Sequence, residues 1–214
     1  MKKYLKIFVS SLGAGILIAL GGFIFLSLKE TSPYLGAFLF SLGLITIISF
    51  GMYLFTGKVG YIFDNKVNYL IDLSICWIGN LFGAVMTGYL LRLTRINLLN
   101  VASKVVESKL NDNLLSIFIL SIFCGMMIYI AVELQKRNVS NIVKLVGIIM
   151  PIMVFIISGF EHCVANMFYF SYANMWSLKA IGYLLIMSIG NGVGSLILYW
   201  INRFINEKKG NLGE

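Results

Sequence analysis

The sequence predicts an all-α integral membrane protein with six transmembrane helices, two of them broken, built as an inverted repeat. Hydrophobic residues make up 59% of the 214 positions and charged residues only 12%, whereas soluble domains carry about 25% charged residues. The chain contains six apolar runs, and each is long enough to cross a bilayer core about 30 Å thick, which requires about 20 residues. In addition, a short motif recurs at about half the length of the chain.

The first apolar run follows three lysines, as a secretion signal does. It spans residues 7–28, longer than the 7–15 apolar residues of a signal peptide, so we expect a membrane helix. The expected segments cover residues 5–28, 34–63, 67–91, 114–134, 142–171 and 177–204. The connections are short except at residues 92–113, so we expect one membrane domain over residues 1–214, with inverted halves at roughly 1–100 and 105–205.

The basic residues predict the orientation. Eleven of the 17 Lys and Arg residues fall on the side of the N-terminus, so the positive-inside rule places both termini in the cytoplasm of a multi-pass protein of the cell membrane. Because these residues flank the apolar runs and form no stripe, the net charge of +8 does not indicate nucleic-acid binding. Four of the six outer cations lie in residues 92–113, which form either a basic vestibule that attracts anions or a solvated loop.

Segments 34–63 and 142–171 are about 30 residues long, and each has a polar interruption, at 55–58 and at 158–162. Such interruptions are tolerated at membrane depth only where protein or a water-filled path surrounds the freed backbone. Paired broken helices in the two halves of a chain indicate a substrate site. The sequence therefore predicts a site where the two interruptions meet.

The recurring motif supports two related halves. Residues 78–83 (IGNLFG) reappear at 189–194 (IGNGVG), an offset of 111 residues. Because each half has three crossings, the second must be inverted relative to the first. Asn80 and Asn191 occupy the same motif position, and we interpret them as helix-packing residues, with ligand binding as the alternative.

His162 is the only histidine, and it lies beside Glu161 in an apolar span. Ionisable groups inside a membrane usually face a cavity and serve function; the alternative is a histidine bonded to a backbone carbonyl. In an inverted repeat Thr56 approaches His162, where its hydroxyl can donate to one imidazole nitrogen and fix the tautomer. The alternative is a bond from the hydroxyl to its own helix. The three cysteines lie apart in apolar runs and suggest neither disulfides nor a metal site, and we expect no cofactor.

Residues 158–168 (SGFEHCVANMF) resemble the signature of the formate/nitrite transporter family nearly residue for residue. Residues 38–44 (FLFSLGL) and 54–56 (LFT) are similar to its second segment, and the Gly-Asn pairs fit its third and sixth. The resemblance covers essentially the whole chain. It implies an aquaporin-like fold, a homopentamer with one pore in each protomer, and a channel or transporter for small monovalent weak-acid anions such as formate or nitrite.

The resemblance also implies a site. A central histidine lies between two apolar constrictions, and the anion becomes protonated near it, so that a neutral acid crosses the apolar slit at a lower desolvation cost. The partners are thus the anion, a proton and the bilayer. The implied pore residues are His162, Thr56, Glu161, Asn166 and the vestibule Lys109, the outer constriction is Phe40 with Phe155, and the cytoplasmic one is Leu44, Leu54 and Phe55.

Three positions depart from the family pattern. Tyr53 stands where an acidic residue is common, Gly125 where an asparagine is expected, and Lys58 is unusual. These departures leave open a member selective for hydrosulfide, acetate or lactate. A neutral-solute pore of the aquaporin type is disfavoured because the paired Asn-Pro-Ala boxes are missing, and an enzyme because one histidine supplies no convergent catalytic groups. A purely structural subunit leaves Glu161 and His162 unexplained.

Overall fold

The computed structural model describes residues 2–211, with side chains described through Asn206. Residues 1 and 212–214, the outermost positions of the expected domain, lie outside the described residues, as do the side chains of Lys208 and Lys209. The elements are α1 (Lys2–Leu28), α2 (Pro33–Ser49), α3 (Phe55–Lys58), the 3₁₀ helix η1 (Val59–Asp64), α4 (Tyr69–Arg92), α5 (Leu99–Leu110), α6 (Leu114–Lys136), α7 (Asn141–Ile157), α8 (Cys163–Ala173) and α9 (Leu178–Asn211).

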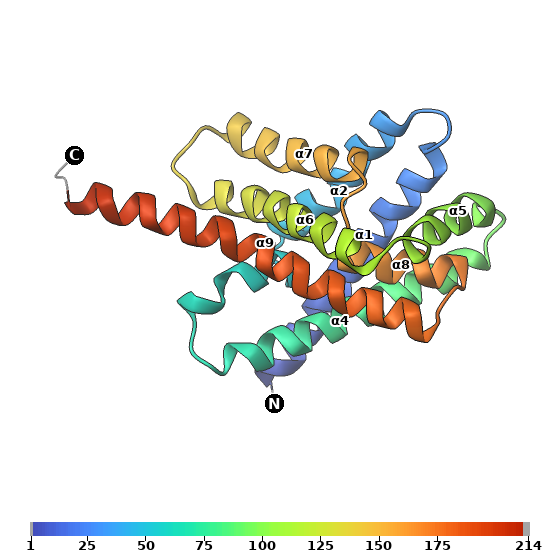
Figure 1. Cartoon of the computed structure of the whole chain (residues 1–214), viewed down its shortest axis with the longest axis horizontal. Coiled ribbons are helices and arrows are strands. Elements are labelled where there is room, and N and C mark those ends of the chain that lie inside the picture. Colours follow the sequence, from blue (N-terminus) through green and yellow to red (C-terminus); the bar gives the residue numbers. More distant parts are fainter. Residues whose placement is uncertain (1, 212–214) are drawn as a thin grey trace.

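The all-helical membrane fold is confirmed, and the crossings divide into two kinds. Four helices, α1, α4, α6 and α9, are long and apolar enough to cross a membrane. The expected segments 34–63 and 142–171 are instead each built from a shorter apolar helix followed by a half-helix, α2 with α3 and α7 with α8. In Figure 1, α5 lies at the right-hand end of the molecule and the C-terminal part of α9 at the left-hand end.

The two chain breaks have the same backbone conformation. Gly51 and Gly159, which follow the ends of α2 and α7, have φ angles of +65° and +70°, a region that glycine adopts at little cost. Met52 then donates to the Ile47 carbonyl at 2.9 Å, as Phe160 donates to that of Phe155. These are Schellman ends, in which a glycine lets the chain turn away and still satisfies the last carbonyls.

The position expected for the first break is therefore wrong. Residues 55–58, expected to interrupt the segment, form α3, and the break lies before them at residues 50–54. The reason is that the turn depends on the positive φ of Gly51, not on the polarity of Thr56 and Lys58. The second break, at residues 158–162, lies where expected.

Asn80 and Asn191 brace the two breaks in the same way. The Asn80 Oδ1 accepts from the backbone N–H of Phe55, the first residue of α3, at 2.8 Å, and its Nδ2 donates to two carbonyls, of Ser11 and Tyr53. The Asn191 Oδ1 accepts from Cys163, the first residue of α8, at 2.9 Å, and its Nδ2 likewise donates to two carbonyls. Each side chain thus satisfies backbone groups that the break frees, as buried groups require.

The segment at residues 92–113 is more ordered than a loop. It contains α5, which packs against α8. Ala102 and Val106, one turn apart, are buried, whereas Glu107 is exposed, as in an amphipathic helix. This packing places the last turn of α5, with Lys109, beside the second break.

Helix packing explains why Gly125 stands where the resemblance led us to expect an asparagine. A Cβ atom at this position of α6 would lie 2.1 Å from the backbone oxygen of Asn191 in α9. Such a contact is far below van der Waals distance, so the close approach of α6 and α9 requires glycine here. An asparagine at position 125 does not fit this packing.

Candidate functional site: a histidine between two cavities

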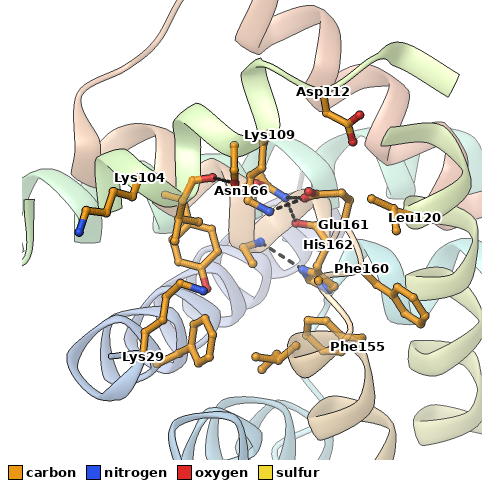
Figure 2. Close-up of a pocket in the computed structure, with 17 residues that line it drawn as sticks. Lys29, Lys104, Lys109, Asp112, Leu120, Phe155, Phe160, Glu161, His162 and Asn166 are labelled. Atoms are coloured by element: carbon orange, nitrogen blue, oxygen red, sulfur yellow. Dashed lines mark hydrogen bonds and ion pairs between the residues drawn. The ribbon is translucent and has the colours of Figure 1, made fainter. Parts of the chain in front are cut away.

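A cavity of about 450 Å³ opens near α5. Its wall includes the second break, with Glu161 and His162, and the last turn of α5, with Lys109. Figure 2 shows Lys109, Asn166 and Glu161 gathered on one side of this outer cavity, with His162 and Phe155 next to them and Lys29 across from them. The outer cavity therefore ends at the histidine.

His162 caps the N-terminus of α8 with its ring. The Nδ1 atom accepts a hydrogen bond from the backbone N–H of Ala165 at 3.1 Å, so Nδ1 carries no proton. A neutral imidazole has one N–H, which is then at Nε2. The Nε2 lies 2.9 Å from the Thr56 Oγ1, and the ring donates to the hydroxyl. The direction is opposite to the expected one, because the backbone cap sets the tautomer.

Thr56 and His162 meet although they are 106 residues apart in sequence. Both side chains are buried, with 1% and 2% of the residue exposed. Because the Thr56 oxygen accepts from the ring, its own hydrogen is free to point elsewhere, and among the described residues it has no other acceptor. The imidazole thus donates to the Thr56 hydroxyl and polarises it, which makes this hydroxyl a better donor to a third group.

Glu161 is buried and holds two donors. Its Oε2 accepts from the Lys109 ammonium at 2.7 Å and from the Asn166 amide at 2.8 Å. The same amide donates to the His162 carbonyl at 3.0 Å, so Asn166 ties both residues of the break to α8. A buried carboxylate requires such pairing, and the ion pair makes this part of the wall nearly neutral.

Two aromatic rings narrow the path beside the histidine. The rings of Phe40 in α2 and Phe155 in α7 meet edge to face, with centroids 5.8 Å apart. The Phe155 ring also stacks on the His162 imidazole, with centroids 5.6 Å apart and planes 22° from parallel. Phe155 therefore lines the outer cavity and also supports the imidazole ring.

A second cavity of about 160 Å³ lies at the opposite end, where α2 and α6 finish. Leu44 and Leu54, both buried, are in the wall of this inner cavity. Phe55 is not in the wall of the inner cavity, and it lines an apolar groove between α4 and α9. The other expected site residues line one of the two cavities or contact a residue that does, and the two asparagines lie behind the breaks.

Lys29 is one of the six outer cations that were counted to predict the orientation. It lines the outer cavity, although the sequence did not single it out. Its ammonium lies 5.2 Å from the Phe25 ring centroid. Burial lowers the pKa of this ammonium, and the nearby charge of Lys109 lowers it further, while Glu30 acts in the opposite direction. In the sequence, the position of Lys29 at the end of the first apolar run is the one feature that points to the outer end of the molecule.

The chemistry of the site is that of hydrogen bonding and proton exchange. Within the described part of the chain, no group of three or more His, Cys, Asp and Glu side chains gathers as a metal site requires. The outer cavity is lined by His162 and the inner cavity by the neighbours of Thr56, so the buried Thr56–His162 pair connects the two linings.

Comparisons with known proteins agree with this geometry. A family model described as "Formate/nitrite transporter" matches residues 1–204. The chain is 31% identical over 191 residues to the "Uncharacterized transporter YrhG" of Bacillus subtilis, covering 81% of this chain and 71% of that protein. It is 28% identical to the "Formate channel FocB" of Escherichia coli, over 78% of this chain and 66% of FocB. It is also 26% identical to the "Nitrite transporter NirC" of the same organism, with 92% and 83% covered.

Solved structures show the same fold. The "Pentameric formate channel with formate bound" superposes with a TM-score of 0.82 at 25% identity, over 96% of this chain and 98% of that one. An "FNT family ion channel" superposes with a TM-score of 0.83 at 23% identity, over 94% and 90%. These relatives and structures are channels or transporters, and none is described as an enzyme. With both its sequence and its fold matching, the chain belongs to the formate/nitrite transporter family.

Proposed function

We propose that the protein passes small monovalent weak-acid anions, such as formate or nitrite, across the cell membrane, and that the anion takes up a proton near His162. The observation that carries this proposal is the buried hydrogen bond between the His162 Nε2 and the Thr56 Oγ1, in a core that is otherwise largely apolar. The names of relatives include both formate and nitrite carriers, which supports the class of substrate.

The hydrogen bonds of His162 suggest how protonation proceeds. A proton added to the ring would go to Nδ1, where it would face the Ala165 N–H and break the cap. The neutral ring instead donates from Nε2 to Thr56, whose hydroxyl is then free to donate to the anion. The anion takes its proton from water in the outer cavity, crosses the apolar passage as a neutral acid, and releases that proton on the far side.

This route suits weak acids because of desolvation. An anion that leaves water for an apolar slit loses far more solvation free energy than a neutral molecule of the same size. Formate and nitrite gain a proton easily enough to avoid this cost, whereas chloride does not. An apolar passage with one polar pair therefore selects by acidity rather than by size.

The assembly and orientation are part of the proposal. A homopentamer with one pore in each protomer is supported by the superposition on a channel described as pentameric. The distribution of Lys and Arg supports an orientation with both termini in the cytoplasm. The cavity near α5 is then the outer vestibule, and the one near Lys58 the cytoplasmic vestibule.

Transport into liposomes tests the function. Uptake of formate, nitrite, hydrosulfide, acetate and chloride is measured with the purified protein while the external pH is lowered from about 8 to about 5. We expect weak-acid flux to rise as the pH falls and chloride flux to stay low. A flat pH response, or chloride flux equal to formate flux, would contradict proton uptake during passage.

Two substitutions at Thr56 test the role of its hydroxyl. Thr56→Val keeps the shape but removes the hydroxyl, and we expect formate flux to fall about ten-fold. Thr56→Ser keeps the hydroxyl and is expected to retain most of the flux. If the two variants transport equally well, the hydroxyl has no part in passage.

A further inference from the structure

The inner cavity differs in charge from the outer one. Only two charged residues line it, Lys58 from α3 and Lys136 from α6, and no Asp or Glu does. The outer cavity has three lysines, but also Asp112 and the Glu161 that neutralises Lys109 at 2.7 Å. The smaller cavity is therefore the more one-sidedly positive of the two.

Lys58 is the cation of the inner cavity that lacks a counter-ion. In the described part of the chain its ammonium has no carboxylate in ion-pair contact, and it lies 4.8 Å from the ring centroid of Tyr53. Lys136 is compensated differently, with its ammonium 3.2 Å from the Tyr61 ring centroid and 3.9 Å from the Glu133 Oε2. The two lysines also repel each other electrostatically, so an anion placed between them lowers the free energy of both.

The position of Lys58 connects this charge to the passage. It is the last residue of α3, two residues beyond Thr56, and shares the inner cavity with Leu44 and Leu54. Asn80 donates to the backbone carbonyl of Tyr53 and so holds this residue in the first break. The Tyr53 ring provides an aromatic face for the Lys58 ammonium. The Lys58 ammonium is thus held in the same cavity as the apolar side chains of Leu44 and Leu54.

We propose that Lys58, resting on Tyr53 and joined by Lys136, forms a binding station for a small monovalent anion in the inner cavity. The proposal rests on the proposed function, since it names the place where the anion waits before entering, or after leaving, the apolar passage. A volume of about 160 Å³ accommodates an anion of three or four atoms with a few waters, at about 30 Å³ for each water.

Flux measured from each side tests the station. The full chain is reconstituted into liposomes sorted by the side on which a C-terminal tag is exposed, and formate is supplied from one side at low salt. For entry from the inner-cavity side, we expect Lys58→Met to raise the half-saturating formate concentration about five-fold, with little change in maximal rate. Entry from the other side should keep the wild-type half-saturation.

Three further variants make the result specific. Lys58→Arg keeps the charge and should restore the wild-type value, and Tyr53→Phe keeps the aromatic face and should leave it unchanged. Lys66→Met removes an exposed cation at the same end of the molecule that lines none of the cavities described above, and serves as the matched control. An unchanged half-saturation in Lys58→Met, or an equal rise in Lys66→Met, would overturn the proposal.

A binding measurement separates the two proposals. Formate should raise the melting temperature of the detergent-solubilised wild type at low salt more than that of Lys58→Met. If the wild type transports no weak acid but this difference persists, the proposed function fails and the station stands. If transport is normal and the difference is missing, the station fails alone.

Discussion

The two chain breaks share a frame but differ in what they present to the passage. In both, a glycine with positive φ ends one helix, and an asparagine from a long helix braces the first N–H of the next half-helix. At the residue before each half-helix, however, the first break has Leu54 and the second has His162.

This difference separates architecture from chemistry. The repeat supplies two half-helices that meet end to end, and it would do so with any side chain that the breaks tolerate. The polar pair arises where the halves differ, with the histidine from one and Thr56 from the other. The carboxylate of Glu161 likewise has the phenol of Tyr53 as its counterpart in the first break. The polar groups of the site therefore arise from the departures from symmetry.

Making the second break resemble the first should have the largest effect. His162→Leu removes the donor to Thr56 and leaves an apolar passage, so formate flux into liposomes should fall about 100-fold. Because the ring also caps α8, the variant must be shown to elute as the same oligomer as the wild type. Flux near the wild-type rate from an intact oligomer would rule out a role for the imidazole.

The shared frame can be broken on either side. Asn191→Leu and Asn80→Leu each remove three hydrogen bonds to backbone groups, so each should lower the free energy of unfolding by about 3 kcal/mol. The loss should be somewhat larger for Asn191, whose three bonds are all buried. Thermal unfolding in detergent measures both, and a large loss for only one would show that the two breaks are not equivalent.

The smallest effect should come from Lys29, which belongs to the outer cavity alone. Because its pKa is lowered, it loses its proton at a lower pH than an ordinary lysine, and the cavity loses positive charge as the pH rises. Lys29→Met should reduce formate entry from this side about two-fold at low salt and remove that part of the alkaline decline. Initial rates of formate entry at several pH values measure this effect. If the rate for Lys29→Met declines with rising pH as steeply as that of the wild type, another group is responsible for the loss of charge.

Much of this arrangement could be predicted from sequence because it follows from length and polarity. A span of about 30 residues with a polar interruption indicates a break, and the one histidine in an apolar run indicates a site. The approach of Thr56 to His162 followed from the inverted repeat. The same reasoning misplaced the first break, because polarity there reflects what lines the passage, whereas the turn depends on Gly51 and on a contact from Asn80, distant in sequence.

Other features depend on contacts that a sequence does not reveal. The ion pair between Lys109 and Glu161 requires α5 to pack on α8, a contact between segments far apart in the sequence. The direction of the Thr56–His162 hydrogen bond depends on a backbone N–H three residues after the ring. The position of Phe55 in the groove between α4 and α9, and not in the wall of the inner cavity, depends on how those two helices pack.

The cap on α8 has a consequence for how such a channel can change. Residue 162 holds a helix end with one ring nitrogen and presents a donor with the other. A substitute that caps well, such as serine or aspartate, is too short to reach Thr56, and one that only fills space leaves the helix end open. Selectivity is therefore easier to alter at the neighbouring walls than at the histidine, and we expect natural or engineered changes of substrate to accumulate around a fixed imidazole.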